Sequence, residues 1–275
     1  MRKPKPVAAT PAALAVLAVL FMGAATPALG GVHYKAATDT DNGAGRADHV
    51  QVEGWVSSGK GRVEFVQSGN PIAKPGTYIL TRDGGHTIYL VDPQDKSYAQ
   101  WSIDGMVGMV GSLMNSLGPL VRIQFSDPKV EKLLEEDGGT VAGQPTRHYR
   151  YRTSYTMSVK VLGMGRPSAV VSDEDMWVAT GLSDPALGLW LRAEPPRTGN
   201  PDFDGLMAAN WAKPTGFPLK IATVSTRTDK AGKQAVSRHT MEVTELTTTA
   251  VPDSRFEIPA GYQEKSPLPG AQKSQ

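Results

Sequence analysis

The chain has 275 residues and a nearly balanced charge, with 29 lysines and arginines against 27 aspartates and glutamates. It contains no cysteine, which excludes a disulfide framework and also a lipid-modified cysteine that would tether the protein to a membrane. No block of basic residues could follow a phosphate backbone, so we expect no nucleic-acid partner.

The first thirty residues, 1–30, are predicted to be a signal peptide. Three basic residues precede an apolar run over residues 12–25, and this run is shorter than the roughly 20 residues that a membrane-spanning helix requires. Ala28 and Gly30 have the spacing that a signal peptidase prefers. Cleavage after Gly30 would leave 26 basic and 27 acidic residues and no stable membrane anchor. We therefore expect a periplasmic or secreted protein; the alternative is an uncleaved anchor.

The mature part is predicted to form one domain over residues 31–262, followed by a disordered tail over residues 263–275. About 245 residues are enough to bury a core without disulfides, and all-β domains of this size commonly form one unit. The tail is polar and contains Pro267, Pro269 and Gly270, a composition typical of an untethered chain end.

The first half of the domain is predicted to be β-structure. Residues 31–40 resemble a first strand, and residues 48–101 read as five short strands separated by turns. Within them Val50, Val52 and Val56 alternate with polar or small residues, which is the period of a strand with one buried face. The result is a meander.

A helix is predicted after the meander, over residues 103–117, with Ser102 as its N-cap. Three glycines lie opposite its apolar arc and weaken it by roughly 1 kcal/mol each. The helix is interpreted either as a lid that fills the concave face of the sheet or as the wall of a cavity for a lipid-like ligand, since methionine adapts to irregular apolar shapes. The candidate ligand-binding residues are Met106, Val110, Leu113, Met114 and Leu117.

Strands are predicted to resume at residues 121–125 and to break at Asp127-Pro128. Residues 130–136 are ambiguous, and Gly138-Gly139 is expected to end them. Residues 146–157 alternate strongly, which predicts a strand with a basic face that either binds an anion or is simply solvated. A further strand is expected over residues 169–180.

The last part of the domain is predicted to contain two short helices and a hairpin. The helices are expected near residues 187–192 and 201–212, and the hairpin turns at residues 229–233. Together these elements predict a mostly β (α+β) fold, a strongly curved antiparallel sheet that forms an incomplete barrel with covering helices.

No catalytic or metal-binding motif stands out. The five histidines lie in five segments without metal-ligand spacing, and no nucleophile elbow or phosphate-binding glycine loop is present. The acidic run from Asp173 to Asp175 is interpreted as a solvated turn. We expect no cofactor, no metal and no enzyme; an active site would require two of His86, His148, Asp173 and Glu174 to meet in a cleft.

The segment GTYILTRDGGHTIYLVDP and the ending Phe256-Glu257-Ile258-Pro259 resemble uncharacterised exported bacterial proteins related to the outer-membrane lipoprotein carriers of the LolA and LppX type. This resemblance implies an unclosed, curved sheet whose apolar concave face takes acyl chains under covering helices. It places no functional residue on this chain.

Two functions follow as expectations. The first is an exported binding protein that holds a lipid or acyl chain between sheet and helices, with a role in envelope lipid or lipoprotein trafficking. The second is an envelope interaction or sensor protein with a filled core, whose proline-rich section over residues 185–218 meets a partner protein.

Overall fold

The computed structural model describes residues 31–43, 47–71, 73–102, 105, 108, 121–162, 164–182, 195, 197–211, 213 and 216–266. The predicted signal peptide, almost all of the predicted methionine-rich helix and the end of the predicted tail lie outside these residues. Among the described residues, no helix combines the length and the apolar character needed to span a bilayer.

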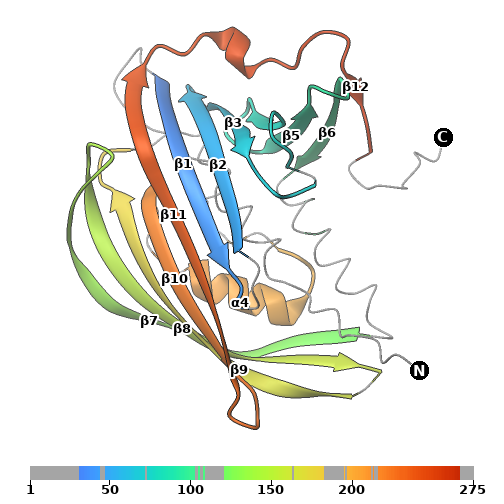
Figure 1. Ribbon diagram of the computed structural model, residues 1–275, viewed down its shortest axis with the longest axis vertical. Coiled ribbons are helices and arrows are strands. Elements are labelled where there is room, and N and C mark those ends of the chain that lie inside the picture. The colour runs from blue at the N-terminus through green and yellow to red at the C-terminus, as the bar shows by residue number, and fades with distance from the viewer. Residues whose placement is uncertain are drawn as a thin grey trace.

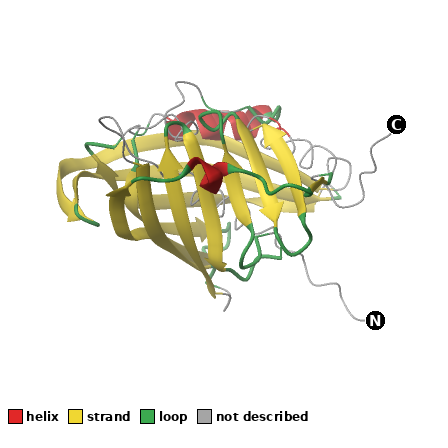
Figure 2. Ribbon diagram, turned by 90° about the horizontal axis from the view of Figure 1, so that it is seen from above, coloured by secondary structure: helices red, strands yellow, loops and turns green. Residues whose placement is uncertain are grey.

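One sheet of twelve strands organises the described chain (Figure 1). Its spatial order is β12-β6-β5-β4-β3-β2-β1-β11-β10-β9-β8-β7, and every pairing is antiparallel except that of β12 with β6. The two outermost strands, β12 and β7, do not pair with each other, so the sheet is open. Figure 2 shows that it is also strongly curved. The predicted incomplete barrel agrees with this architecture. The strands are β1 Gly31–Asp41, β2 Ala47–Ser57, β3 Lys60–Gln67, β4 Tyr78–Thr81, β5 Thr87–Asp92, β6 Ser97–Ser102, β7 Val121–Val141, β8 Gln144–Val161, β9 Met164–Ala179, β10 Pro218–Thr228, β11 Gln234–Thr249 and β12 Gln263–Glu264.

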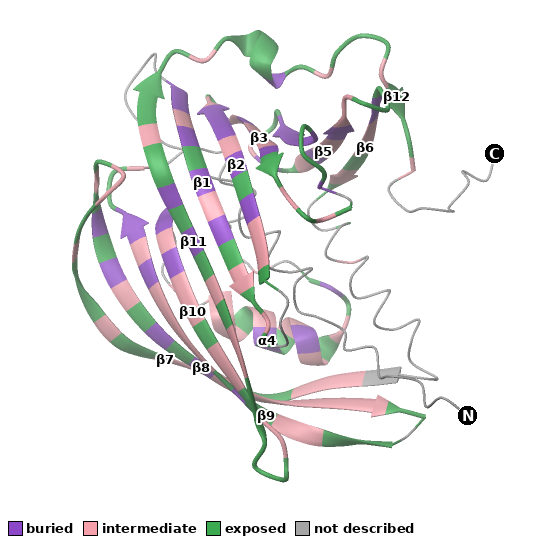
Figure 3. Cartoon of the chain, in the orientation of Figure 1, coloured by how far each residue is buried: buried purple, intermediate pink, exposed green. Residues whose placement is uncertain are grey.

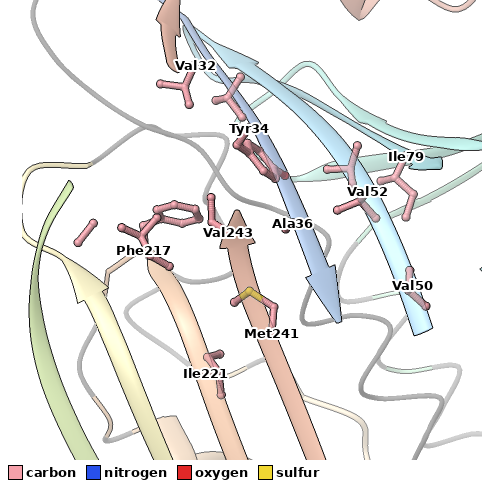
Figure 4. Close-up of a cluster of buried hydrophobic side chains, with 14 of the residues drawn as sticks. Val32, Tyr34, Ala36, Val50, Val52, Ile79, Phe217, Ile221, Met241 and Val243 are labelled. Carbon is pink, nitrogen blue, oxygen red and sulfur yellow. The ribbon is translucent and has the colours of Figure 1, made fainter. Parts of the chain in front are cut away.

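The main core lies on the concave side of the sheet, where alternating apolar residues of the neighbouring strands β2, β1, β11 and β10 line one surface (Figure 4). Tyr34 and Phe217 are both almost fully buried and meet there with ring centroids 6.5 Å apart. Gly54 lies directly opposite Tyr34 on the neighbouring strand, and a side chain at this position would overlap the tyrosine ring. The meander predicted from the valine alternation is therefore confirmed, with its valines in the core.

A second apolar cluster lies on the outer face of the meander and is covered by the end of the chain. Phe256 of the 3₁₀ helix η2, Asp253–Phe256, packs with Trp55, Tyr78 and Leu80. Arg255 lies over the Trp55 ring, 4.3 Å from its centroid. The concave face of the sheet is thus buried by the curvature of the sheet itself. The outer face of the meander is buried by the C-terminal segment.

Two predicted strand ends are wrong because both are bulges within one long strand. β7 continues through Asp127-Pro128 and through Gly138-Gly139, with register shifts at both places. Asp127 and Gly139 have positive φ, 56° and 64°, so each absorbs an extra residue while the ladder with β8 continues. The chain reverses only after Val141.

The predicted helix near residue 201 is present as α4, Pro201–Trp211. The Asn200 side chain accepts a hydrogen bond from the Phe203 amide at 3.1 Å, and proline at the first helical position needs no partner for an amide. α4 lies across the concave side of β7, where Phe203 meets Phe125 at 5.5 Å between ring centroids (Figure 1). The other predicted helix, residues 187–192, lies outside the described residues.

The chain end differs in part from the predicted disordered tail. Gln263 and Glu264 form β12 beside Ser97 and Tyr98 of β6, and the Lys265 amide donates to the Tyr98 carbonyl at 2.8 Å. This pairing was not visible in the sequence, because a two-residue parallel strand has no periodicity.

Candidate functional site

The candidate site is the concave face of the sheet around α4, where one row of side chains runs across five strands. Strand register places Thr40, His239, Thr223, Glu174 and Tyr151 as successive cross-strand partners on β1, β11, β10, β9 and β8. We call these five residues the transverse row. On its core side, the next inward positions are the buried Met241, Ile221 and Met176, so the row marks where the main core ends.

A largely buried ion pair stands at the centre of the transverse row. Lys213, two residues beyond the end of α4, places its Nζ 2.7 Å from Glu174 Oε1, and the two side chains are only 13% and 21% exposed. Thr223 Oγ1 donates to the other carboxylate oxygen at 3.4 Å. Since a buried charge requires a partner, this pair fastens the end of α4 to the sheet.

A second polar contact also fastens α4. Thr153, two residues beyond Tyr151 on β8, donates from its hydroxyl to Asn210 Oδ1 at 3.3 Å, and the Asn210 amide nitrogen donates to the Leu206 carbonyl at 2.9 Å. The helix is therefore held to the concave face by discrete polar contacts at its C-terminal end and by aromatic packing at Phe203.

Beyond the transverse row, on the side away from the core, the concave face keeps apolar and aromatic side chains that are only half buried. Phe125 lies 5.9 Å from Tyr155 between ring centroids, and Met157 pairs in register with Phe125. Burial raises the pKa of the Tyr155 hydroxyl. This surface, Phe125, Tyr155 and Met157, is called the apolar trough below.

His239 makes the transverse row sensitive to pH. Its Nδ1 lies 3.1 Å from Thr40 Oγ1, and burial lowers the pKa of the imidazole below its ordinary 6.5, although nearby Glu174 partly offsets the effect. A histidine with a lowered pKa in the folded state takes up its proton more readily when the chain unfolds, so protonation favours unfolding.

We therefore expect the protein to lose stability as the pH falls below 6.5, down to the lowered pKa of folded His239. Other groups also titrate in this range, so the informative quantity is the difference between the native protein and His239→Gln. Thermal melts at about pH 7.5 and at about pH 5 should show a smaller decrease in Tm for His239→Gln. An equal decrease in both proteins would contradict this role.

The acidic run does not form the predicted solvated turn, since it lies within β9. Asp173 and Asp175 point to the outer face and bind the basic residues of β8: Arg152 to Asp173 at 2.7 Å and Arg150 to Asp175 at 2.8 Å. Glu174 points to the concave face. The basic face of β8 is thus paired with these carboxylates, which disfavours the anion-binding interpretation.

The residues named for a possible active site lie apart. His148 is on the outer face, with Nδ1 3.0 Å from Glu136 and Nε2 2.7 Å from Asp175, whereas Glu174 is on the concave face. His86 Nδ1 contacts the Asp83 carbonyl at 2.7 Å. Within the ranges that the structure describes, no three His, Asp or Glu side chains are grouped so as to hold a metal ion.

The predicted ligand-binding residues, Met106, Val110, Leu113, Met114 and Leu117, lie outside the described residues, as does the first part of the proline-rich section, residues 185–194. The pairing of Lys213 with Glu174 is not predicted by the sequence. The alternation of β9 does place Glu174 on the buried face, and a carboxylate there indicates a buried partner. Only the fold shows that this partner follows α4.

A pocket of about 230 Å³ lies at the β1 end of the transverse row, where it is lined by Thr40 together with residues of β1, β2 and β11. Charged residues contribute much of its lining, including Asp39, Asp48 and Arg238. Apolar and aromatic side chains are the usual lining of a site for an apolar ligand, and we take the apolar trough, which carries them on the concave face beside α4, as the candidate.

Fold and site together define a half-barrel protein, an open curved sheet with a helix fastened across its concave face. Residues 119–262 match a domain of unknown function (DUF4412), and the chain belongs to this family. The match includes β7–β11, α4 and the segment that covers the meander. The prediction of an uncharacterised family is thereby confirmed.

Two solved structures are similar to the chain at 9% sequence identity. One is an uncharacterised conserved protein from Thermus thermophilus, with a TM-score of 0.34 over 85% of this chain and 90% of that one. The other is a LolA superfamily protein from Nitrosomonas europaea, with a TM-score of 0.31 over 82% of this chain and 90% of that one. The comparison with curated proteins found no match.

Proposed function

We propose that this protein is an exported binding protein that holds a hydrophobic ligand, a lipid or an acyl chain, between its curved sheet and its helices. The observation that supports it is the apolar trough: Phe125, Tyr155 and Met157 remain half buried on the concave face although α4 lies across it. Apolar and aromatic surface in a concave site is the usual lining of a ligand pocket.

The transverse row gives the proposed ligand a polar end. The Glu174–Lys213 pair is held by Thr223 and lies on the core side of the trough, separated from Tyr155 by the level of Thr153, so an amphipathic molecule could place its chain on Tyr155 and direct its head toward the ion pair. Export, with a periplasmic or secreted location, rests on the predicted signal peptide. We propose no catalytic step, and a role in envelope lipid or lipoprotein trafficking fits this chemistry.

The test uses two neighbouring residues of β8 that face opposite sides of the sheet. Met157→Glu places a charge in the apolar trough, whereas Thr156→Glu places the same charge on the outer face. Titration with a fluorescent long-chain fatty acid should show binding to the native protein and to Thr156→Glu. Met157→Glu should weaken binding about tenfold or more, because a charge is costly in an apolar site.

Native mass spectrometry of protein purified from a cell envelope provides an independent measurement, in which a copurified lipid is expected. Absence of copurified lipid together with equal probe affinity in Met157→Glu and Thr156→Glu would contradict the proposal. The alternative, an interaction or sensor protein of the envelope, would then be the better proposal, and crosslinking in the envelope should recover its partner.

A further inference from the structure

The hairpin of β8 and β9 ends in an exposed apolar tip (Figure 3). Val161 and Met164 pair with each other and enclose a two-residue loop that begins with Leu162. The exposed fractions of Val161, Met164 and Leu162 are 50%, 75% and 64%, respectively. Large apolar side chains gathered on a projecting end are uncommon on a soluble surface and indicate an interaction site.

Leucine is an unfavourable residue at the loop position that Leu162 occupies. Leu162 has a φ of +51°, in the left-handed region that disfavours a branched apolar residue and favours glycine or asparagine. The equivalent positions of two other two-residue loops have φ of 53° and 47° and carry the small residues Ser58 and Ala142. A leucine at this position therefore adds strain and exposed apolar surface, and neither contributes to the fold.

The tip projects beyond β10, while β7 runs beside β8 up to the pair Val121 and Val161. β10 last pairs with β9 at Thr228 and Ala169, and β9 begins at Met164, so the hairpin of β8 and β9 extends past its neighbour by about 16 Å at a rise of about 3.3 Å per residue. The tip can therefore contact a surface that the paired part of β10 and β11 does not reach.

The charges around the tip are of one sign. Residues 154–172, which form this part of β8 and β9, contain the two basic residues Lys160 and Arg166 and no acidic residue. The contrast with the next part of the same hairpin is clear, because Arg150 and Arg152 there are paired with β9 carboxylates. An apolar tip with cations behind it is complementary to an anionic lipid surface, apolar below and negative at the headgroups.

We propose that the tip formed by Val161, Leu162 and Met164 docks the protein on anionic lipid bilayers, with Lys160 and Arg166 contacting the headgroups. This inference does not depend on whether the apolar trough binds a ligand. It commits the tip to a membrane surface and not to a protein partner, because the side chains form a projecting end instead of a groove, and the charge is uniformly basic.

The absence of native cysteine allows one label to report on the tip alone. Leu162→Cys and, as the matched control, Leu133→Cys would carry the environment-sensitive dye NBD; Leu133 is also an exposed leucine, 46% exposed, but lies on β7 away from the tip. With vesicles of dioleoylphosphatidylglycerol, NBD emission at residue 162 should increase and shift to the blue, and emission at residue 133 should not change.

Vesicle sedimentation of unlabelled protein gives the affinity. Binding should be stronger to phosphatidylglycerol than to phosphatidylcholine vesicles, and Leu162→Asn should weaken it about tenfold, within the range expected for losing one buried leucine side chain. Lys160→Gln and Arg166→Gln should each weaken it about fivefold, and only for the anionic vesicles. Leu162→Asn suits the positive φ, so an unchanged or higher Tm would show that unfolding is not the cause.

Three results would overturn the proposal: no binding of the native protein to phosphatidylglycerol vesicles, equal dye responses at residues 162 and 133, or unchanged affinity in Leu162→Asn. If the native protein does not bind these vesicles, crosslinking from residue 162 to an envelope protein would show that the tip contacts a protein instead of a membrane.

Discussion

Phe256→Ala is expected to lower the free energy of unfolding by about 3–5 kcal/mol, the usual cost of truncating a buried phenylalanine. Phe256 is only 1% exposed and packs among Trp55, Tyr78 and Leu80 on the outer face of the meander. Such a loss is a large part of the roughly 5–15 kcal/mol that stabilises a typical domain. Urea denaturation followed by circular dichroism measures it.

Two variants control this experiment. Glu257→Ala changes the next residue, which is exposed, and should alter stability by no more than about 0.5 kcal/mol. Phe256→Leu keeps most of the apolar volume and should cost less than the alanine variant. A loss below about 1 kcal/mol for Phe256→Ala would show that the C-terminal segment does not seal the outer face in solution.

Lys213→Met is expected to lower the free energy of unfolding by about 3 kcal/mol, because it leaves the Glu174 carboxylate buried without its cation. Glu174→Gln in the same background removes the unpaired charge, so the double variant should recover much of the loss. Thermal or urea unfolding of the four proteins in this double-mutant cycle gives the coupling energy directly.

The pair between Lys220 and Glu242 is the matched control, since it also joins a lysine to a glutamate at 2.9 Å but with side chains 38% and 48% exposed. Lys220→Met should cost only about 0–1 kcal/mol, as is typical of surface pairs. Equal losses in Lys213→Met and Lys220→Met would argue against a special role of the Glu174 pair in holding α4.

The strands could be predicted where one face is buried and the other is exposed to solvent, because apolar and polar residues then alternate along the sequence. Val50 and Val52 of β2 show this pattern, and so does the regular face of β8. β7 could not be predicted as one strand, since Asp127 and Gly139 carry the signals of a turn. Whether such a signal reverses the chain or only bulges it depends on the partner strand, which supplies the continuing hydrogen bonds.

The site was less predictable than the fold. Glu174 belongs to an acidic run that favours a solvated interpretation, and its partner Lys213 is separated from it by a helix and a proline-rich section. A cross-strand row such as Thr40, His239 and Glu174 depends on register between distant segments, and register is set by the assembled sheet. The exposed tip at Leu162 was visible in the sequence only as a leucine beside a glycine.

The position of β1 has a consequence for how the chain acquires its structure. β1 begins the described chain, yet it pairs with β2 on one side and with β11 on the other, so its second neighbour is among the last segments to leave a ribosome or an export channel. Folds dominated by such distant pairings form slowly, in about milliseconds to seconds. Until β11 arrives, β1 has an open edge that can pair with another chain. For the export proposed above, the late pairing of β11 with β1 favours an extended polypeptide during transport. For the same reason, chains that end before Gln234 should be prone to aggregation, because the edge of β1 then stays unpaired.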